Sequence, residues 1–233
     1  MPRKTRMYLP DIPVHVVQRG NNRDACFFCE DEYRYFLDRL REGQGRFGVA
    51  LHAYVLMTNH VHLLMTPRDT AGISRLMQHL GRHYVLYVNR QYRRTGTLWE
   101  GRHKASLVQA DKYLLTSMRY IELNPVAAGM VQSPEQYRWS SYRCHAWGEP
   151  NPWLRDHDLY VRLGASEHDR QCAYRELFRA QIPETDIHDI RECLAYNHPL
   201  GNDRFREQIE STLGKRVGRR QRGRPPKHVD APR

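Results

Sequence analysis

Four short segments of the chain read as β-strands, and the first of them shows the period of two that is typical of a strand. In the first segment Val14 and Val16 fall on one face, whereas His15 falls on the other. Only the turn residues Thr58 and Asn59 separate the second segment from the third, so these two should pair as a hairpin. The four predicted strands cover residues 12–19, 49–57, 60–66 and 105–109.

Between these strands the apolar residues recur with the period of an α-helix. Tyr33, Phe36 and Leu40 mark a first helix, and two more are predicted over about 73–88 and about 111–123. Proline disfavours the helical conformation in the residue before it, so the Asn124-Pro125 pair should end the third helix. This order of elements predicts an antiparallel sheet with helices on one or both faces, an α+β fold.

The pattern changes near residue 150. Helical periods continue without strand signals at 175–180, 186–196 and 203–213, and residues 214–227 contain seven basic residues and no acidic one. We therefore expect a main domain at 1–150, a helical accessory module at 151–214 and a flexible basic tail at 215–233.

The charge of the chain narrows the choice of partner. Lysine and arginine number 37 against 26 acidic residues, a net charge of +11, which favours nucleic acid ahead of a membrane surface. No apolar run reaches the ~18 residues needed to span a bilayer, and the N-terminus lacks the apolar stretch of a secretory signal. Five cysteines, an odd number, suit a reducing compartment, so we expect a cytoplasmic protein without a membrane partner.

His60 and His62 lie two residues apart on the third predicted strand, so their side chains share one face of the sheet. The two imidazoles can converge on one divalent ion, while Val61 points the other way into the core. Two imidazoles do not complete a coordination shell, so a third protein ligand and open positions are implied. The alternative stays open: with 13 histidines, two can fall on a solvated sheet face by chance.

The third predicted helix has an apolar stripe and a polar stripe. The apolar stripe comprises Leu114, Leu115, Met118 and Ile121, and the polar stripe Tyr113, Thr116, Ser117, Tyr120 and Asn124. Tyr120 and Asn124 are four positions apart and therefore neighbours, so a phenol and an amide can reach a common ion or phosphate. A nearby cation would stabilise the phenolate of a tyrosine, whose free pKa is about 10. Alternatively, Tyr120 is one of 14 tyrosines and packs in the core.

Five sequence blocks stand in order between residues 7 and 150. They read HVVQRGNNR (15–23), HAYVLMTNHVHLLMTP (52–67), LWEGRHKASLV (98–108), RYIELNPVAAGMV (119–131) and YRWSSYRCHAWG (137–148). Together they resemble the single-tyrosine His-hydrophobic-His transposases, and more closely the bacterial branch associated with repetitive extragenic palindromes. The resemblance implies a core similar to ferredoxins and RNA-recognition motifs.

The resemblance also implies a chemistry. Members of this family cut and rejoin single-stranded DNA near a hairpin. A tyrosine attacks a phosphodiester and forms a 5′-phosphotyrosine link, assisted by Mg²⁺ or Mn²⁺ and without a nucleoside triphosphate. The palindrome-associated branch resembles monomers, whereas transposing relatives exchange tyrosine helices in a dimer. For this chain the resemblance therefore implies a monomer that is bacterial and nucleoid-associated.

Carried over to this sequence, the resemblance assigns His60 and His62 as metal ligands and Tyr120 as the nucleophile. Asn124 takes the place of the third ligand, a position that holds Gln in some relatives. Glu122 is an alternative third ligand, but two residues from Tyr120 it faces away from the site.

Three groups of residues are candidates for DNA contacts, because Arg and Asn pair with base edges or phosphates and aromatic rings stack on unpaired bases. The groups are Arg19, Asn21, Asn22 and Arg23; Trp99, Arg102, His103 and Lys104; and Arg138, Trp139 and Tyr142. The alternatives are a plain polar turn for the first group and packing in the core for the two tryptophans.

The tail contains Arg222 and Arg224 in a short stretch that resembles an AT-hook, which lays arginines in the minor groove of AT-rich duplex DNA. Sequence-independent phosphate contacts are the alternative. The helical module at 151–214 is expected to be an accessory DNA-binding module. Two competing functions remain: a protein that binds palindromic or AT-rich DNA without cutting it, and an RNA-binding domain with the same sheet pattern.

Overall fold

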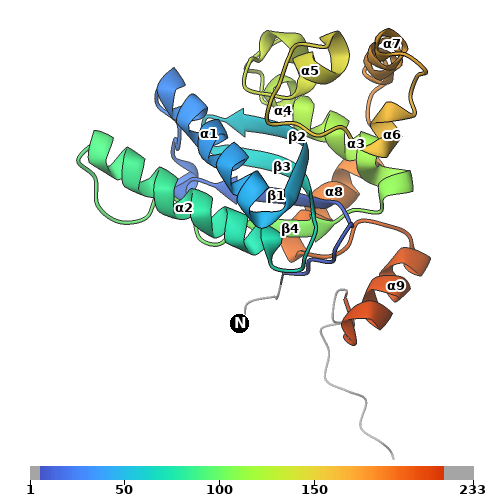
Figure 1. Ribbon diagram of the computed structural model, residues 1–233, viewed down its shortest axis with the longest axis horizontal. Coiled ribbons are helices and arrows are strands. Elements are labelled where there is room, and N and C mark those ends of the chain that lie inside the picture. Colours follow the sequence, from blue (N-terminus) through green and yellow to red (C-terminus); the bar gives the residue numbers. More distant parts are fainter. Residues whose placement is uncertain (1–5, 218–233) are drawn as a thin grey trace, which may run out of the picture.

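The chain folds around one four-stranded antiparallel sheet (Figure 1). The computed structural model describes residues 6–217. Its strands lie side by side in the order β2-β3-β1-β4. They are β1 (Val14–Arg19), β2 (Val49–Met57), β3 (His60–Pro67) and β4 (Lys104–Leu107). The predicted strands, the hairpin and the α+β class are confirmed.

The pairing of β1 with β3 at the centre of the sheet fixes which side chains share a face. Val17 pairs with His62, and Arg19 pairs with His60. Because successive side chains of a strand alternate between faces, His60 and His62 project to one face and Val61 to the other. Val61 is fully buried, as the alternation predicts.

Two helices, α1 (Glu30–Phe47) and α2 (Gly72–Gln91), cover the face of the sheet that carries Val61 (Figure 1). α1 begins at Cys29 with a capping box, in which the side chain of Glu32 accepts from the Cys29 backbone amide. It ends at Gly48, whose φ of 61° is the left-handed conformation that terminates many helices. These local signals place both ends of α1.

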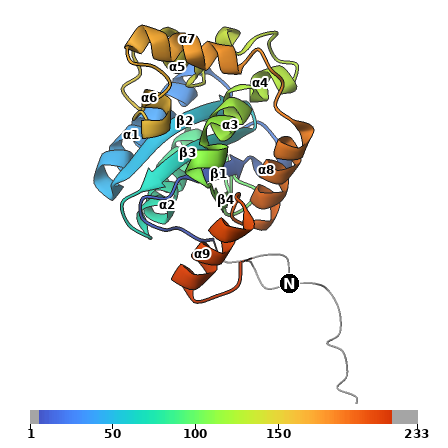
Figure 2. The same cartoon turned by 90° about the vertical axis from the view of Figure 1, so that its right-hand side faces the viewer.

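The opposite face of the sheet, which carries the histidines, is covered by α3 (Ala110–Glu122) (Figure 2). Leu114, Met118 and Ile121 are buried against this face. The predicted polar stripe is wrong in part, because Tyr113 and Ser117 are buried as well. The C-terminal helices pack on the side of α3 that faces away from the sheet. Side chains on that side of α3 would face solvent if the sheet and α3 stood alone, but here they are enclosed.

α3 gives way to a short second helix, α4 (Asn124–Ala127). Pro125 occupies the first turn of α4. Backbone N–H groups in the first turn have no acceptor within the helix, so proline, which lacks this group, costs no hydrogen bond there. The prediction that α3 ends at the Asn124-Pro125 pair is confirmed, but the chain continues into another helical turn. Asn124 therefore starts α4 while remaining one turn beyond Tyr120.

The outer edge of β2 is covered by the segment that follows α4. The backbone amide of Leu56 donates to the Trp139 carbonyl oxygen, and that of Ser141 donates to Tyr54 O. Arg155 N donates to Leu51 O farther along the same strand. These bonds satisfy an edge that would otherwise be free to pair with another chain.

Five further helices complete the described part of the chain. The helix predicted at 175–180 is present with other bounds, because α7 begins after Ser166, whose side chain accepts from Asp169 N, and has ended before residue 178. The predicted helix at 203–213 is confirmed by α9. The elements are α5 (Tyr142–Trp147), α6 (Asp158–Val161), α7 (Glu167–Leu177), α8 (Glu184–Tyr196) and α9 (Asp203–Leu213), with 3₁₀ turns at Asn21–Arg23 and Pro134–Gln136.

Packing is continuous across the domain boundary that we predict near residue 150. Tyr174 of α7 and Ile190 of α8 belong to the same apolar cluster as Val55 of β2. α8 also lies beside β4 and β1 (Figure 2). The division into 1–150 and 151–214 remains a prediction from composition. None of the helices within residues 6–217 is long and apolar enough to cross a membrane.

Candidate active site on the histidine face

Four of the predicted site residues meet on the histidine face of the sheet. The ring centroids of His60 and His62 are 5.0 Å apart on β3. Tyr120, near the end of α3, has its ring centroid 5.9 Å from that of His62. The side chain of Asn124, at the start of α4, lies next to the His60 imidazole. Two imidazoles, a phenol and an amide thus converge although about sixty residues separate the strand from the helix.

The His60 ring is held in one protonation form. Its Nδ1 lies 2.6 Å from Oδ1 of Asn59, an oxygen that can only accept, so Nδ1 carries the hydrogen in this bond. Burial and the nearby Arg19 guanidinium lower the pKa of His60 to about 4, while the adjacent Asn124 side chain opposes them. The ring is therefore neutral at physiological pH, with the lone pair on Nε2.

Asn124 presents its amide oxygen toward the site. Its Nδ2 donates to the backbone carbonyl of Tyr120 at 2.7 Å, so the nitrogen end of the amide is occupied by the helix. Oδ1 is the end left for His60. An amide oxygen and an imidazole lone pair that face the same point are both acceptors, and a cation is the partner that satisfies both.

His15, which our sequence analysis did not assign to the site, completes the histidine face. His15 Nε2 and His62 Nδ1 are 2.8 Å apart, and the His15 ring packs edge-on against Tyr120 with centroids 6.0 Å apart. Burial lowers the pKa of His15 to about 3, and burial together with His15 lowers the pKa of His62 well below its usual value. The signal was present in the sequence, since the alternation of β1 places His15 on the face opposite to Val14.

The donor set fits a divalent cation. Both imidazoles are neutral, as metal ligands must be, and each uses Nδ1 in a second hydrogen bond, which leaves Nε2 for a ligand. Across residues 6–217, no three His, Cys, Asp or Glu side chains are arranged to hold a metal ion. A cation held by His60 and His62 would find its further ligands in the Asn124 oxygen and in water or substrate.

Glu122, the alternative third ligand, is excluded by its position. Its carboxylate is fully buried on the other side of α3 and accepts hydrogen bonds from Ser141, His145 and Tyr174. These partners lie on or beside α5 and on α7. Glu122 therefore anchors the helix that carries Tyr120 and does not reach the histidines.

The first group of predicted DNA contacts lies next to the histidines. Arg19 is paired across the sheet with His60, and the loop that follows is an exposed 3₁₀ turn. Asn22 and Arg23 adopt left-handed φ angles of 52° and 63°. The backbone amide of Gly20 donates to Asn59 O at 2.8 Å, which ties this loop to the β2–β3 turn.

The four residues of the second group of predicted DNA contacts differ in burial. Trp99 is 8% exposed and stacks on Tyr84, and His103 is 7% exposed and bonds to Tyr8 and Arg6. The Trp99 ring thus packs in the core, as the alternative interpretation has it, and its stacking on a DNA base stays a prediction. Burial, followed by Arg6, lowers the pKa of His103 to about 3, so His103 is not a cation.

Arg102 and Lys104, by contrast, are exposed and line an open cavity of about 630 Å³ beside β4. The cavity also reaches Arg19 and Gln18, so it borders the histidine face. Glu100 is the acidic residue among those that line it. This arrangement leaves a basic depression at the β4 edge of the sheet.

The third group lies at the opposite edge of the sheet, beside β2. Trp139 stacks on Tyr33 with centroids 4.6 Å apart, and Arg138 covers the Trp139 ring while pairing with Glu30 at 2.6 Å. Tyr142 is 5% exposed. The predicted base-stacking role of Tyr142 is therefore wrong, and the Arg138 charge is already balanced within the chain.

The predicted accessory DNA-binding module lacks the net positive charge that is typical of such a module. Residues 151–214 contain twelve acidic residues and eight basic ones, a net charge of −4 within a chain of net charge +11. An acidic segment repels the phosphate backbone. The structure therefore supports a role for these helices in packing, and not in DNA binding. Arg222 and Arg224 of the predicted AT-hook lie outside the described residues.

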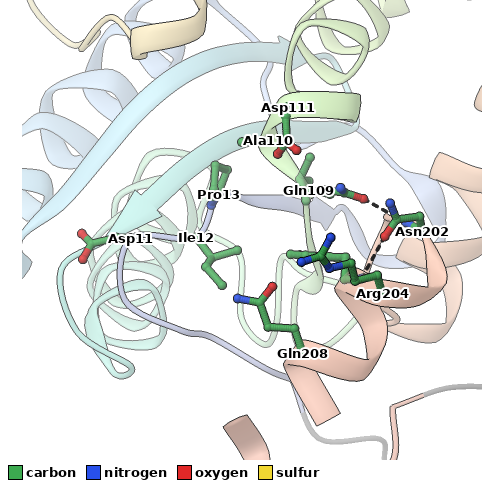
Figure 3. Close-up of a pocket in the computed structure, with 11 residues that line it drawn as sticks. Asp11, Ile12, Pro13, Gln109, Ala110, Asp111, Asn202, Arg204 and Gln208 are labelled. Carbon is green, nitrogen blue, oxygen red and sulfur yellow. Dashed lines mark hydrogen bonds between the residues drawn. The ribbon is translucent and has the colours of Figure 1, made fainter. Parts of the chain in front are cut away.

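A separate cavity of about 480 Å³ lies between the start of α3 and α9 (Figure 3). Gln109 accepts a hydrogen bond from the Asn202 backbone amide at 2.9 Å across its rim. Arg204 shares this cavity with Asp11 and Asp111, so the lining carries no excess of positive charge. None of the predicted site residues lines it.

Comparison with known proteins identifies the domain that carries this site. Residues 9–124 match the family described as Transposase IS200 like. The chain belongs to this family. The matched stretch holds β1, the β2–β3 hairpin and α3, and it ends at Asn124, so it includes every residue that meets on the histidine face. Family membership implies an enzyme that acts on DNA in transposition.

Two similar proteins extend this comparison. A Haemophilus influenzae protein named as a REP-associated tyrosine transposase is 26% identical over 122 residues, covering 47% of this chain and 69% of that protein. A solved structure of a REP-associated tyrosine transposase bound to a REP hairpin is 17% identical and covers 67% of this chain and 93% of its own, with a TM-score of 0.55. At that identity the structural likeness shows the fold alone, and it confirms the predicted fold.

Proposed function

We propose that this transposase-family protein nicks and rejoins single-stranded DNA at palindromic hairpin sites through a 5′-phosphotyrosine intermediate on Tyr120. The observation that carries the proposal is the position of the Tyr120 ring, 5.9 Å from His62, on the face that His60 and His62 share. A nucleophile, two neutral imidazoles and an amide oxygen at one point are the parts that a metal-assisted phosphoryl transfer requires.

The proposed reaction is a transesterification. The Tyr120 hydroxyl gives up its proton as its oxygen forms a bond to the phosphorus, and the bond from phosphorus to the 3′ oxygen breaks. That oxygen takes up a proton and leaves as a 3′-hydroxyl, so the net step moves one proton from the phenol to the 3′ oxygen. One phosphodiester is exchanged for another, so rejoining is the reverse step and needs no nucleoside triphosphate. His60, His62 and Asn124 would hold Mg²⁺ or Mn²⁺, and the bound ion would polarise the phosphate under attack.

The distribution of charge supports a DNA substrate. Residues 1–150 contain 21 basic and 13 acidic residues, a net charge of +8. Among them, Arg19, Arg102 and Lys104 line the depression that borders the site. The hairpin bound to the similar solved structure is consistent with a hairpin substrate for this chain. Arg222 and Arg224 add a candidate contact to AT-rich duplex DNA.

We further propose that the protein acts as a monomer. In the described chain Tyr120 already lies beside His62 of the same molecule, so the site does not need a tyrosine helix from a second copy. Gel filtration with light scattering in the presence of hairpin DNA tests this part of the proposal, and a stable two-to-two complex would contradict it.

The test of the proposed chemistry is covalent capture. A 5′-labelled and a 3′-labelled single strand carrying a hairpin from the region around the gene are incubated with the protein and Mg²⁺ or Mn²⁺. The strand segment 3′ to the nick should become attached to the protein, and chelation with EDTA should abolish the adduct. In Tyr120→Phe the adduct should disappear while DNA affinity stays unchanged. An adduct of wild-type yield in Tyr120→Phe would show that another residue is the nucleophile.

The competing function, a binding protein that does not cut, gives the opposite pattern. It predicts wild-type affinity for hairpin DNA in His60→Ala and no adduct in the wild type under any ion. Measuring adduct formation and hairpin affinity on the same set of variants distinguishes the two functions.

A further inference from the structure

Asn59 lies between the Asn21–Arg23 loop and the histidine face, and it bonds to both. Its Nδ2 donates to the Arg23 carbonyl oxygen at 3.0 Å, and its Oδ1 is 2.6 Å from His60 Nδ1. A backbone carbonyl can only accept a hydrogen bond, so Arg23 decides which end of the amide faces His60. Because the oxygen faces the ring, His60 Nδ1 must donate and Nε2 keeps its lone pair.

The Arg23 carbonyl is itself held in place by an unusual backbone. Asn22 and Arg23 have φ angles of 52° and 63°, a region that non-glycine residues adopt rarely. The loop stays in this conformation through bonds from Gly20 N to Asn59 O and from Asn21 N to Leu98 O. A ligand that binds the exposed side of this loop acts on a strained segment whose carbonyl orients Asn59.

We propose that Asn59 is a positioning residue that couples DNA bound at the Asn21–Arg23 loop to the ability of His60 to bind the metal. The proposal rests on the proposed function, since it assumes that the loop contacts DNA and that His60 is a ligand. Asn59 sets the tautomer of His60, and Arg23 sets the orientation of Asn59. Any movement of the loop therefore reaches the ligand nitrogen through two hydrogen bonds.

The first test needs neither metal nor DNA. Nitrogen-15 NMR of the histidine rings, with His60 assigned by comparison with His60→Gln, distinguishes the two neutral tautomers. We expect the Nδ1–H form in the wild type and a mixture in Asn59→Ala. Asn89 is the matched control, because its Nδ2 also donates to a backbone carbonyl, that of Gly96, at 3.0 Å. Asn89→Ala should keep the wild-type tautomer, and an unchanged tautomer in Asn59→Ala would overturn the proposal.

The second test measures Mn²⁺ affinity by electron paramagnetic resonance, in a Tyr120→Phe background so that no DNA is cut. Removing a group that orients a metal-binding histidine typically lowers metal affinity by about 10–100-fold, and we expect this loss in Asn59→Ala. Asn59→Asp keeps an oxygen for His60 but cannot donate to Arg23. It should bind Mn²⁺ at least as tightly as the wild type, because a carboxylate beside Nδ1–H makes the imidazole a stronger ligand. It should nevertheless lose the change in Mn²⁺ affinity that a hairpin oligonucleotide causes.

These outcomes separate the two proposals. If Asn59→Asp responds to DNA as strongly as the wild type, the coupling through Arg23 is wrong, even where the covalent adduct on Tyr120 forms. If the wild type binds no Mn²⁺ and forms no adduct, the proposed function fails, and the coupling to metal fails with it. The tautomer measurement still decides whether Asn59 orients His60.

Discussion

His15 Nε2 and His62 Nδ1 are 2.8 Å apart in a hydrogen bond that joins β1 to β3. His15 is 1% exposed and His62 5% exposed, so water does not compete for this bond. It occupies the Nδ1 of His62 and leaves Nε2 as the nitrogen that can bind a ligand. A residue on a neighbouring strand thus fixes the direction in which a candidate metal ligand points.

We predict that His15→Leu lowers Mn²⁺ affinity and the rate of adduct formation by about 10–100-fold, because His62 loses the partner that orients it. His15→Gln, whose amide can replace one hydrogen bond, should recover part of the loss. Isothermal titration with Mn²⁺ and single-turnover kinetics measure the two effects. His52→Leu, at a buried histidine bonded to Thr66 and Arg155, is the control for general loss of packing. Equal losses in the two leucine variants would contradict a specific role for His15.

Glu122 should contribute to stability more than any exposed carboxylate of the chain. Glu122→Ala leaves the Ser141, His145 and Tyr174 donors without their acceptor in the interior, and removing one partner of a buried ionic or polar network costs about 3–5 kcal/mol. Glu122→Gln keeps one acceptor oxygen and should lose less. Urea unfolding gives the free energies. Exposed Glu135→Ala should change the free energy of unfolding by less than about 0.5 kcal/mol, and a similar small effect in Glu122→Ala would refute the anchoring role.

Removing a positive charge at one edge of the sheet should change the salt dependence of DNA affinity, whereas removing one at the other edge should not. Arg102→Gln and Lys104→Gln remove charges of the basic depression beside β4, so each should weaken binding of a single strand and reduce the slope of log affinity against log salt by about 0.7. Arg138→Gln removes a charge that is already paired with Glu30, and it should change neither quantity. Fluorescence anisotropy at several salt concentrations measures both. A larger loss in Arg138→Gln than in the other two would place the DNA at the β2 edge.

Acid should destabilise the protein through buried histidines other than those of the candidate metal site. Burial lowers the pKa of His52 to about 4 and that of His103 to about 3, from an ordinary value of 6.5. Below pH 6.5 the unfolded chain takes up protons that these folded histidines refuse, so the free energy of unfolding falls as the pH falls. The loss is about 1.4 kcal/mol per pH unit for each histidine until the pH nears the folded pKa.

The measurement is urea unfolding between about pH 7 and about pH 5. His52→Gln should flatten the dependence of stability on pH in that range, because glutamine does not titrate. His188, whose side chain is 75% exposed, serves as the control, and His188→Gln should leave the slope unchanged. A slope that is the same in His52→Gln and the wild type would contradict the assignment of acid sensitivity to His52.

The sequence by itself determined the helices and strands of the main domain and the placement of His60 and His62 on one face of a strand. Alternation of apolar residues predicts β1 and β3, and a strand places residues two apart on one face whatever surrounds it. The period of 3.6 predicts α1, α2 and α3, and a helix places Tyr120 one turn before Asn124. These relationships depend on neighbours within a few positions, so a local pattern is sufficient to find them.

Only the tertiary structure decided which residues surround that pair. The register of β1 against β3 brings His15 to His62, and the packing of the loop brings Arg23 to Asn59. Burial of Trp99 and Tyr142, which the sequence presented as candidates for DNA contacts, follows from segments far away in the chain that cover them. A local pattern carries no information on contacts between distant segments, because their free energy arises only when the fold closes.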